Sequence, residues 1–93
     1  SARAAGEKMW PMPVDDDYRE MIKSSIADLQ NISNFKGGGA STAAAFLREF
    51  ALETPWVHLD IAGTAWLDDA KPWAAKGASG VAVRTLVDLV MKL

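Results

Sequence analysis

Residues 56–62 read Trp-Val-His-Leu-Asp-Ile-Ala, and a turn signal follows at Gly63 and Thr64. Apolar side chains occupy both alternating sets of positions in this stretch, except at His58 and Asp60. Such a pattern is typical of a strand that helices cover on both faces, so the sequence predicts an interior strand. Ligands of open α/β sheets bind beyond the carboxyl ends of strands, where a glycine admits a close approach. We therefore expect residues 61–66 to form a pocket wall.

Helical patterns lie on both sides of the predicted strand. Three consecutive aspartates at residues 15–17 are expected to open the first helix, through a cap and favourable charge in its first turn. One face of this helix, spaced by three and four residues, consists of Tyr18, Met21, Ile22, Ser25, Ile26 and Leu29. A second helix is expected over residues 41–50, with a face of Ala43, Phe46, Leu47 and Phe50. A third is expected over residues 81–93, with the inward side chains Val83, Leu86, Val87 and Val90.

Turn-forming residues predict loops over residues 31–39 and 66–80. Residues 1–8 are rich in alanine and read like the last turn of a helix that ends at Gly6. Such a helix would begin before Ser1. The sequence therefore suggests a segment cut from something longer.

Composition limits the classes of function. The chain has 93 residues, of which 49% are hydrophobic and 24% charged, so residues 1–93 predict one small domain or a piece of one. A net charge of −2 provides no field to attract nucleic acid or anionic lipid. The absence of cysteine excludes disulfides and thiolate chemistry. Apolar runs are too short for a membrane helix, and the first residues lack the apolar middle of a signal peptide. Neither a membrane nor a nucleic acid is expected as a partner.

Two polar clusters permit more than one interpretation. Residues 15–17 could bind a hard cation, but three consecutive side chains diverge around a helix, which favours capping. The glycines at residues 37–39 could cradle a phosphate against free backbone N–H groups. They lack the Gly-Lys-Ser/Thr ending of a phosphate-binding loop. A flexible entry to the second helix is favoured, with the alanines at residues 43–45 allowing close helix packing.

His58 and Asp60 would emerge on the same face of a strand, which suits two metal ligands or a His–carboxylate pair. A metal site needs three or four ligands, and no other histidine or cysteine is present. A catalytic pair would lack a nucleophile. The pattern favours a buried, hydrogen-bonded structural pair, or an Asp60 that accepts bonds from the backbone of the loop after Gly63. No constellation in the chain makes an active site.

Residues 56–66, Trp-Val-His-Leu-Asp-Ile-Ala-Gly-Thr-Ala-Trp, resemble the C-terminal region of the leucyl (cytosol) aminopeptidase family. Supporting motifs follow the family's order: Ser-Ile-Ala-Asp-Leu-Gln-Asn-Ile at residues 25–32, Gly-Gly-Ala-Ser-Thr-Ala-Ala-Ala-Phe-Leu at 38–47, Lys-Gly-Ala-Ser-Gly at 76–80 and Val-Arg-Thr-Leu-Val at 83–87. The resemblance covers residues 8–93. Many family members read Asn-Ile-Gly-Gly-Arg where this chain has Asn-Ile-Ser-Asn-Phe-Lys at residues 31–36, so Lys36 would stand in for the arginine.

The resemblance implies an α/β fold with a mixed β-sheet sandwiched between α-helices. It also implies a cytoplasmic, hexameric exopeptidase that uses two divalent ions, zinc or manganese, to release N-terminal amino acids from peptides, often Leu. The family's hallmark segment, Asn-Thr-Asp-Ala-Glu-Gly-Arg, carries catalytic and metal-binding residues and is absent from residues 1–93. We therefore expect a C-terminal segment of the catalytic domain that holds no metal and is inactive alone.

By the family pattern, Ala62 and Ala65 line the hydrophobic pocket for the first side chain of the substrate. Some relatives carry a bulkier Met at the second position, so this pocket is expected to be roomier. The remainder of the catalytic domain and peptide substrates are the expected partners. The alternative is a non-catalytic binding or assembly module with the same fold, which the four tryptophans and the apolar helix faces suit equally well.

Overall fold

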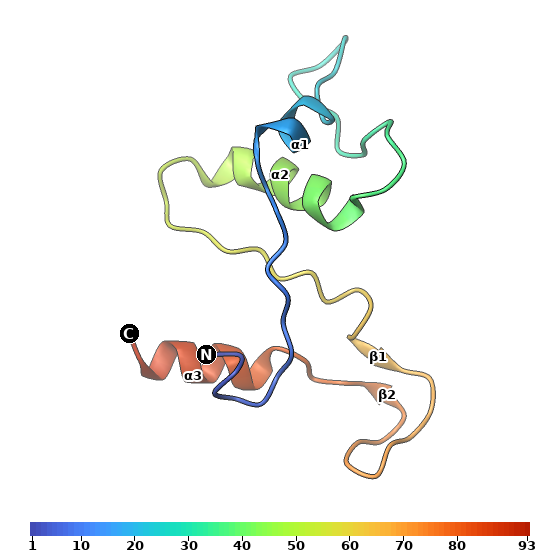
Figure 1. Ribbon diagram of the computed structural model, residues 1–93, viewed down its shortest axis with the longest axis vertical. Helices are drawn as coiled ribbons and strands as arrows, with labels where there is room; N and C mark the ends of the chain where they lie inside the picture. Colours follow the sequence, from blue (N-terminus) through green and yellow to red (C-terminus); the bar gives the residue numbers. More distant parts are fainter. The chain divides into compact units, whose positions relative to one another are not determined.

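The computed structural model describes residues 1–93 and contains three helices and one two-stranded sheet (Figure 1). The elements are α1 (Asp16–Glu20), α2 (Gly39–Ala51), β1 (Trp66–Leu67), β2 (Gly77–Ala78) and α3 (Val83–Met91). Helices and a sheet are both present, as an α/β fold requires. The chain divides into two compact units, one formed by Pro11–Leu59 and the other by Ser1–Trp10 with Asp60–Leu93. None of the helices combines the length and the apolarity needed to cross a membrane.

The unit Pro11–Leu59 consists of α1 packed on α2. Asp15 caps α1 as predicted, because its Oδ1 accepts a hydrogen bond from the N–H of Asp17 at 3.1 Å. The buried residues of this unit are Ile22, Ser41, Thr42, Ala44 and Ala45. Small side chains on α2 therefore allow the two helices to approach closely. An ion pair of 2.7 Å between Arg19 and Glu49 joins their exposed sides.

The first helix is shorter than the sequence pattern predicts. It ends at Glu20, although the apolar spacing continues to Leu29. The hydroxyl of Ser24 accepts hydrogen bonds from the N–H groups of Ile26 and Ala27, at 3.2 and 3.1 Å. In a continuous helix those groups would bond to backbone carbonyls, so the serine turn competes with the helix. Ile26 is 96% exposed as a result.

The second helix forms where it was predicted, but its larger apolar side chains do not face a core. Ala43, Leu47 and Phe50 are exposed, and Phe46 is half-buried. The rings of Phe46 and Phe50 contact each other edge to face, with centroids 5.2 Å apart. The buried residues of α2 are instead the small ones, Ser41, Thr42, Ala44 and Ala45.

Residues 56–62 do not form the predicted strand. No backbone group of residues 56–60 makes a hydrogen bond to another backbone group. The physical reason is that a strand exists only with a neighbour, and residues 1–93 supply none for this segment.

Residues 66–80 were predicted as a loop but contain β1 and β2, which pair antiparallel with Trp66 opposite Ala78. Two-residue strands carry too little pattern to be recognised in the sequence.

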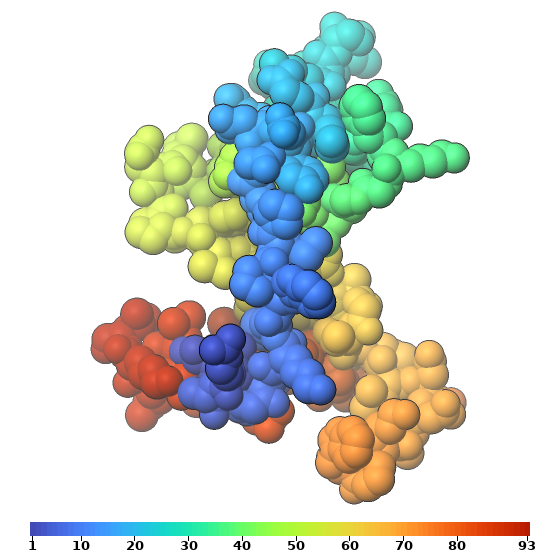
Figure 2. All heavy atoms as spheres, viewed as in Figure 1, coloured from blue at the N-terminus to red at the C-terminus, as the bar shows by residue number.

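In the other unit, the first residues of the chain lie against α3 (dark blue and red in Figure 2). Residues 1–7 form a single helical turn that ends at Gly6, with a φ of +74° and hydrogen bonds from Gly6 N–H to Arg3 O and from Glu7 N–H to Ala2 O. This is the helix-ending turn that the sequence predicts. It places Glu7 beside α3, whose N-cap, Ala82, has no side chain able to cap.

The carboxylate of Glu7 takes the place of that cap. It accepts hydrogen bonds from the N–H groups of Ala82 and Thr85, at 3.1 and 3.3 Å, and from the Thr85 hydroxyl. The side chain of Glu7 is only 7% exposed, and the guanidinium of Arg84 lies 3.8 Å from it. The bond from the Thr85 hydroxyl, aided by both N–H groups, holds the pKa of Glu7 below its usual value against the opposing effect of burial.

The third helix forms where the sequence predicts it, but the prediction of which face it buries is wrong. Only Thr85 and the cap residue Ala82 are buried. The predicted inward side chains Val83, Leu86, Val87 and Val90 are 49–64% exposed. The segment that covers α3 lies on its polar side, through Glu7, so the apolar stripe has no partner within the chain.

Replacing Glu7 by Gln should loosen α3, because the charge that complements the helix N-terminus is lost. Since the pKa of Glu7 is lowered in the folded state, its stabilisation is complete above its unfolded pKa, about 4.3, and disappears as the pH falls through the folded pKa. Urea unfolding of the protein containing this chain should show a lower midpoint for Glu7→Gln at neutral pH. The difference from the wild type should shrink below roughly pH 4.

The matched control is Glu53→Gln, since Glu53 is exposed and makes no hydrogen bond or ion pair. It should leave the midpoint unchanged at every pH. A Glu7→Gln difference that stays constant down to pH 2 would contradict the capping role of the carboxylate.

Candidate functional site

The predicted pocket wall, residues 61–66, consists of a tight turn over residues 61–65 and the first residue of β1, Trp66. The N–H groups of Thr64 and Ala65 both donate to the carbonyl of Ile61, at 2.9 and 2.8 Å. Ala62 is exposed and Ala65 is half-buried. A Cβ atom placed on Gly63 would meet nothing within 4 Å, so the space beside the turn is open. The geometry leaves both alanine positions in one short, internally bonded segment.

Asp60 shapes the entry to this turn. Its Oδ1 accepts a hydrogen bond from the N–H of Ala62 at 3.0 Å. Asp60 is thus a backbone acceptor, but the prediction that its donors lie in the loop after Gly63 is wrong, because the donor is Ala62, just before Gly63. Such a bond between an aspartate and the residue two positions on is a common turn-forming device.

The predicted pairing of His58 with Asp60 is wrong. No hydrogen bond or ion pair joins them, and Asp60 is exposed. The imidazole of His58 instead stacks on the indole of Trp56, with ring centroids 6.0 Å apart and an angle of 23° between the planes.

Ser79 fastens the turn to the segment that precedes α3. Its hydroxyl donates to the carbonyl of Thr64 at 2.6 Å, and its N–H donates to the carbonyl of Ala65 at 2.8 Å. The same hydroxyl accepts a bond from the N–H of Val81 at 3.2 Å. The role of Ser79 could not be predicted from the sequence, because its partners Ala65 and Thr64 are 14 and 15 residues away and no local pattern indicates these hydrogen bonds.

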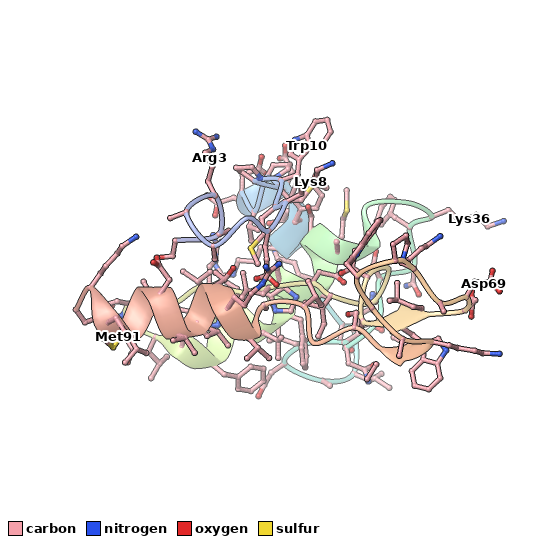
Figure 3. All side chains as sticks on the ribbon, turned by 90° about the horizontal axis from the view of Figure 1, so that it is seen from below. Arg3, Lys8, Trp10, Lys36, Asp69 and Met91 are labelled. Carbon is pink, nitrogen blue, oxygen red and sulfur yellow. The ribbon has the colours of Figure 1, made fainter.

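The glycines at residues 37–39 serve the packing of α2. Gly37 and Gly38 have φ values of +93° and +63°, and a Cβ on Gly38 would lie 3.3 Å from the ring of Tyr18. The hollow beside them, of about 260 Å³, is lined by Asn31, Ile32, Ser33, Phe35, Gly37, Gly39, Thr42 and Ala43. No charged side chain faces it, and Lys36 extends away into solvent (Figure 3). The arrangement offers an anion no cationic partner.

The residues of this chain do not fit a metal centre. No three side chains of the His, Cys, Asp and Glu types gather closely enough to hold an ion. Of the three aspartates at residues 15–17, Asp15 is engaged as the cap of α1, and Asp16 lies 3.9 Å from the guanidinium of Arg48. Their divergence around the first turn of α1 is the physical reason why capping prevails.

Comparison with known proteins gives a consistent result. The family model for the catalytic domain of the cytosol aminopeptidase family matches residues 1–87. A probable cytosol aminopeptidase of Solibacter usitatus is 59% identical over 91 residues, which cover 98% of this chain and 19% of that protein. One from Alkaliphilus oremlandii is 52% identical over 93 residues, covering all of this chain and 18% of that protein.

A solved structure agrees with the sequence relatives. A tomato leucine aminopeptidase mutant matches with a TM-score of 0.85 at 43% identity, over 99% of this chain and 17% of that one. The chain therefore spans 17–19% of the length of these three relatives.

Two substitutions of Asp60 should separate its turn-forming role from metal binding. Asparagine keeps an oxygen that can accept the bond from Ala62 N–H, whereas alanine removes it. We expect Asp60→Asn to be nearly neutral and Asp60→Ala to reduce the free energy of unfolding by about 0.5–1.5 kcal/mol. Denaturant unfolding of the protein containing the chain measures both. Equal damage by the two substitutions, together with weaker zinc binding, would contradict the turn-forming role.

Proposed function

The chain belongs to the cytosol aminopeptidase family, and on that basis we propose that it is a C-terminal segment of a two-metal leucyl aminopeptidase. The complete enzyme would release N-terminal amino acids, often Leu, from peptides. The observation that carries the proposal is the family match over residues 1–87, combined with a span of 17–19% of each relative. A shared segment of this size, without a metal centre of its own, fits a part of the catalytic domain.

The role proposed for the segment is to supply scaffold and substrate-pocket wall. Ala62 and Ala65 would line the pocket for the first side chain of the substrate. Three features support this role: the exposure of Ala62, the open space beside Gly63, and the hydrogen bonds that fix the turn. Two methyl side chains would leave the pocket wide enough for a branched substrate side chain such as that of Leu.

The metal ions are proposed to be held entirely by residues outside this segment. Zinc or manganese would provide the hydrolytic chemistry of the complete enzyme. Since the donor set of residues 1–93 does not fit such ions, we assign no catalytic residue here. The segment alone is expected to be inactive.

The partner proposed for the exposed apolar surface is the remainder of the catalytic domain. The stripe of α3 formed by Val83, Leu86, Val87 and Val90 is 49–64% exposed in this chain. The backbone of residues 56–60 is likewise unpaired, as would suit a strand whose neighbours come from the preceding part of the enzyme. Together these features support a mixed sheet between helices in the complete enzyme. We further propose that this enzyme is a homo-hexamer and that it is located in the cytoplasm, which the relatives' name, cytosol aminopeptidase, supports.

The alternative is a non-catalytic binding or assembly module with the same fold. The exposure of Trp10 and Trp73, at 86% and 81%, favours it, because such surface seeks a partner of any kind. Native mass spectrometry separates the two proposals. Species of 10.0 kDa and its multiples alone would support the module, whereas a larger polypeptide containing residues 1–93 would support the enzyme.

Replacing Ala65 by Trp in the complete enzyme should fill the pocket. We expect the KM for Leu-p-nitroanilide to rise by about tenfold or more, in line with the cost of reshaping a hydrophobic pocket. The same assay tests the proposed function, since cleavage by the unmodified enzyme should require zinc or manganese and stop when a chelator removes it. Absence of metal-dependent cleavage would contradict the proposed function.

Ala75→Trp is the matched control, because Ala75 is exposed and lies outside the turn. It should leave KM unchanged. If Ala65→Trp also leaves the cleavage of Leu substrates unchanged, the pocket assignment is wrong even though the enzyme is active.

A charge on the apolar stripe of α3 should prevent assembly of the complete enzyme. Val87→Glu would place a carboxylate where we propose that the rest of the domain packs. Burying a carboxylate without a positively charged or hydrogen-bonding partner costs several kcal/mol. Size-exclusion chromatography should show loss of folded, assembled enzyme. The control is Met91→Glu, which adds the same charge on the side of α3 that carries Arg84 and Asp88. Equal recovery of the two variants would contradict the proposed partner.

A further inference from the structure

We infer that Ser79 is a positioning residue that fixes the substrate-pocket wall and so sets the preference among substrate side chains. The inference rests on the proposed function, because it takes Ala62 and Ala65 as that wall. Ser79 itself would not contact the reacting atoms. It acts through the backbone of the two residues that carry the end of the turn, Thr64 and Ala65.

The hydroxyl of Ser79 makes two bonds with different partners. It donates its hydrogen to the carbonyl of Thr64 at 2.6 Å and accepts the N–H of Val81 at 3.2 Å. The N–H of Ser79 adds a third link, to the carbonyl of Ala65 at 2.8 Å. Consecutive carbonyls of the wall are therefore held by a single residue. The bonds to the carbonyls of Thr64 and Ala65 restrain the peptide groups on both sides of Ala65.

The other side of Ser79 is tied to α3. Gly80 adopts a φ of +67°, and its carbonyl accepts the N–H of Val83 at 3.2 Å. The next residue but one, Ala82, donates its N–H to Glu7. Ser79 thus lies between the wall and the start of α3, which Glu7 anchors. A displacement of the wall would therefore stretch the hydrogen bonds of Ser79 to Thr64 and Ala65.

Loss of the hydroxyl would not unfold the turn, because the bonds to Ile61 O and Asp60 Oδ1 are internal to it. It would leave the wall held at Ala65 by the N–H of Ser79 and beyond it by the pairing of β1 with β2, with the carbonyl of Thr64 free to shift. The side chain of a Leu substrate would be long enough to contact the wall formed by Ala62 and Ala65, whereas the single methyl group of an Ala substrate would not reach it. Displacement should therefore affect Leu substrates more than Ala substrates.

The test is the steady-state kinetics of the complete enzyme with Leu- and Ala-p-nitroanilide. Ser79→Ala should raise KM for the Leu substrate by about three- to tenfold, the equivalent of one lost hydrogen bond. It should change kcat, and the KM for the Ala substrate, by less than about twofold. Ser79→Thr, which keeps the hydroxyl, should restore the wild-type KM. Ser24→Ala is the matched control, since the Ser24 hydroxyl bonds only to its own turn.

Each outcome is decisive. An equal change for both substrates, a loss in kcat alone, or a failure of Ser79→Thr to restore KM would overturn the inference. If Ser79→Ala does not yield folded enzyme, Ser79→Cys keeps the size with a weaker donor and should give a smaller shift in the same direction. An unmodified enzyme that cleaves neither substrate would instead overturn the proposed function, so the two failures are distinguishable.

Discussion

The carboxylate of Glu7 at the start of α3 is the interaction on which the unit of Ser1–Trp10 and Asp60–Leu93 depends. A helix whose cap is an alanine in the left-handed region, with a φ of +72° at Ala82, has no side-chain cap of its own, so the N–H groups of Ala82 and Thr85 need an acceptor from elsewhere. Glu7 supplies that acceptor from 75 residues away in the sequence. Because α3 is then fixed, the residues just before it are fixed as well. Ser79 transmits this constraint to Thr64 and Ala65 through short hydrogen bonds.

Most of the apolar surface that the sequence encodes has no partner within the chain. Apart from alanines, Ile22 is the only buried apolar side chain, while the apolar faces of α2 and α3 stay largely exposed. A stable domain does not normally leave this much patterned apolar surface in water. The pattern agrees with the proposal that this chain, which spans 17–19% of the length of its relatives, packs against other parts of a complete enzyme.

The same reasoning explains which features could be predicted from the sequence. The cap at Asp15, the turn ending at Gly6 and the helices α2 and α3 follow local rules, so neighbouring residues were sufficient. Three features depend on distant or missing partners and could not be predicted: the unpaired backbone of residues 56–60, the hairpin of β1 and β2, and the cap from Glu7. At the candidate site, the roles of Ala62 and Ala65 came from a family resemblance. Ser79 had no local signal at all.

A segment without catalytic groups can still determine which substrates an enzyme cleaves, because the atoms that contact the substrate side chain differ from those that carry out the reaction. Here the polar side chains near the wall serve geometry: Asp60 shapes the entry to the turn, and Ser79 holds its far end. Under the proposed function, the surface offered to a substrate would be the two methyl groups of Ala62 and Ala65 on a stiff backbone, which would discriminate by space alone. Discrimination by space requires that the wall stay fixed to within a few tenths of an ångström, roughly the tolerance of close packing. Stiffness of the turn, and through it the anchoring of α3 by Glu7, would then contribute to the proposed specificity of the pocket as much as the size of Ala65 does.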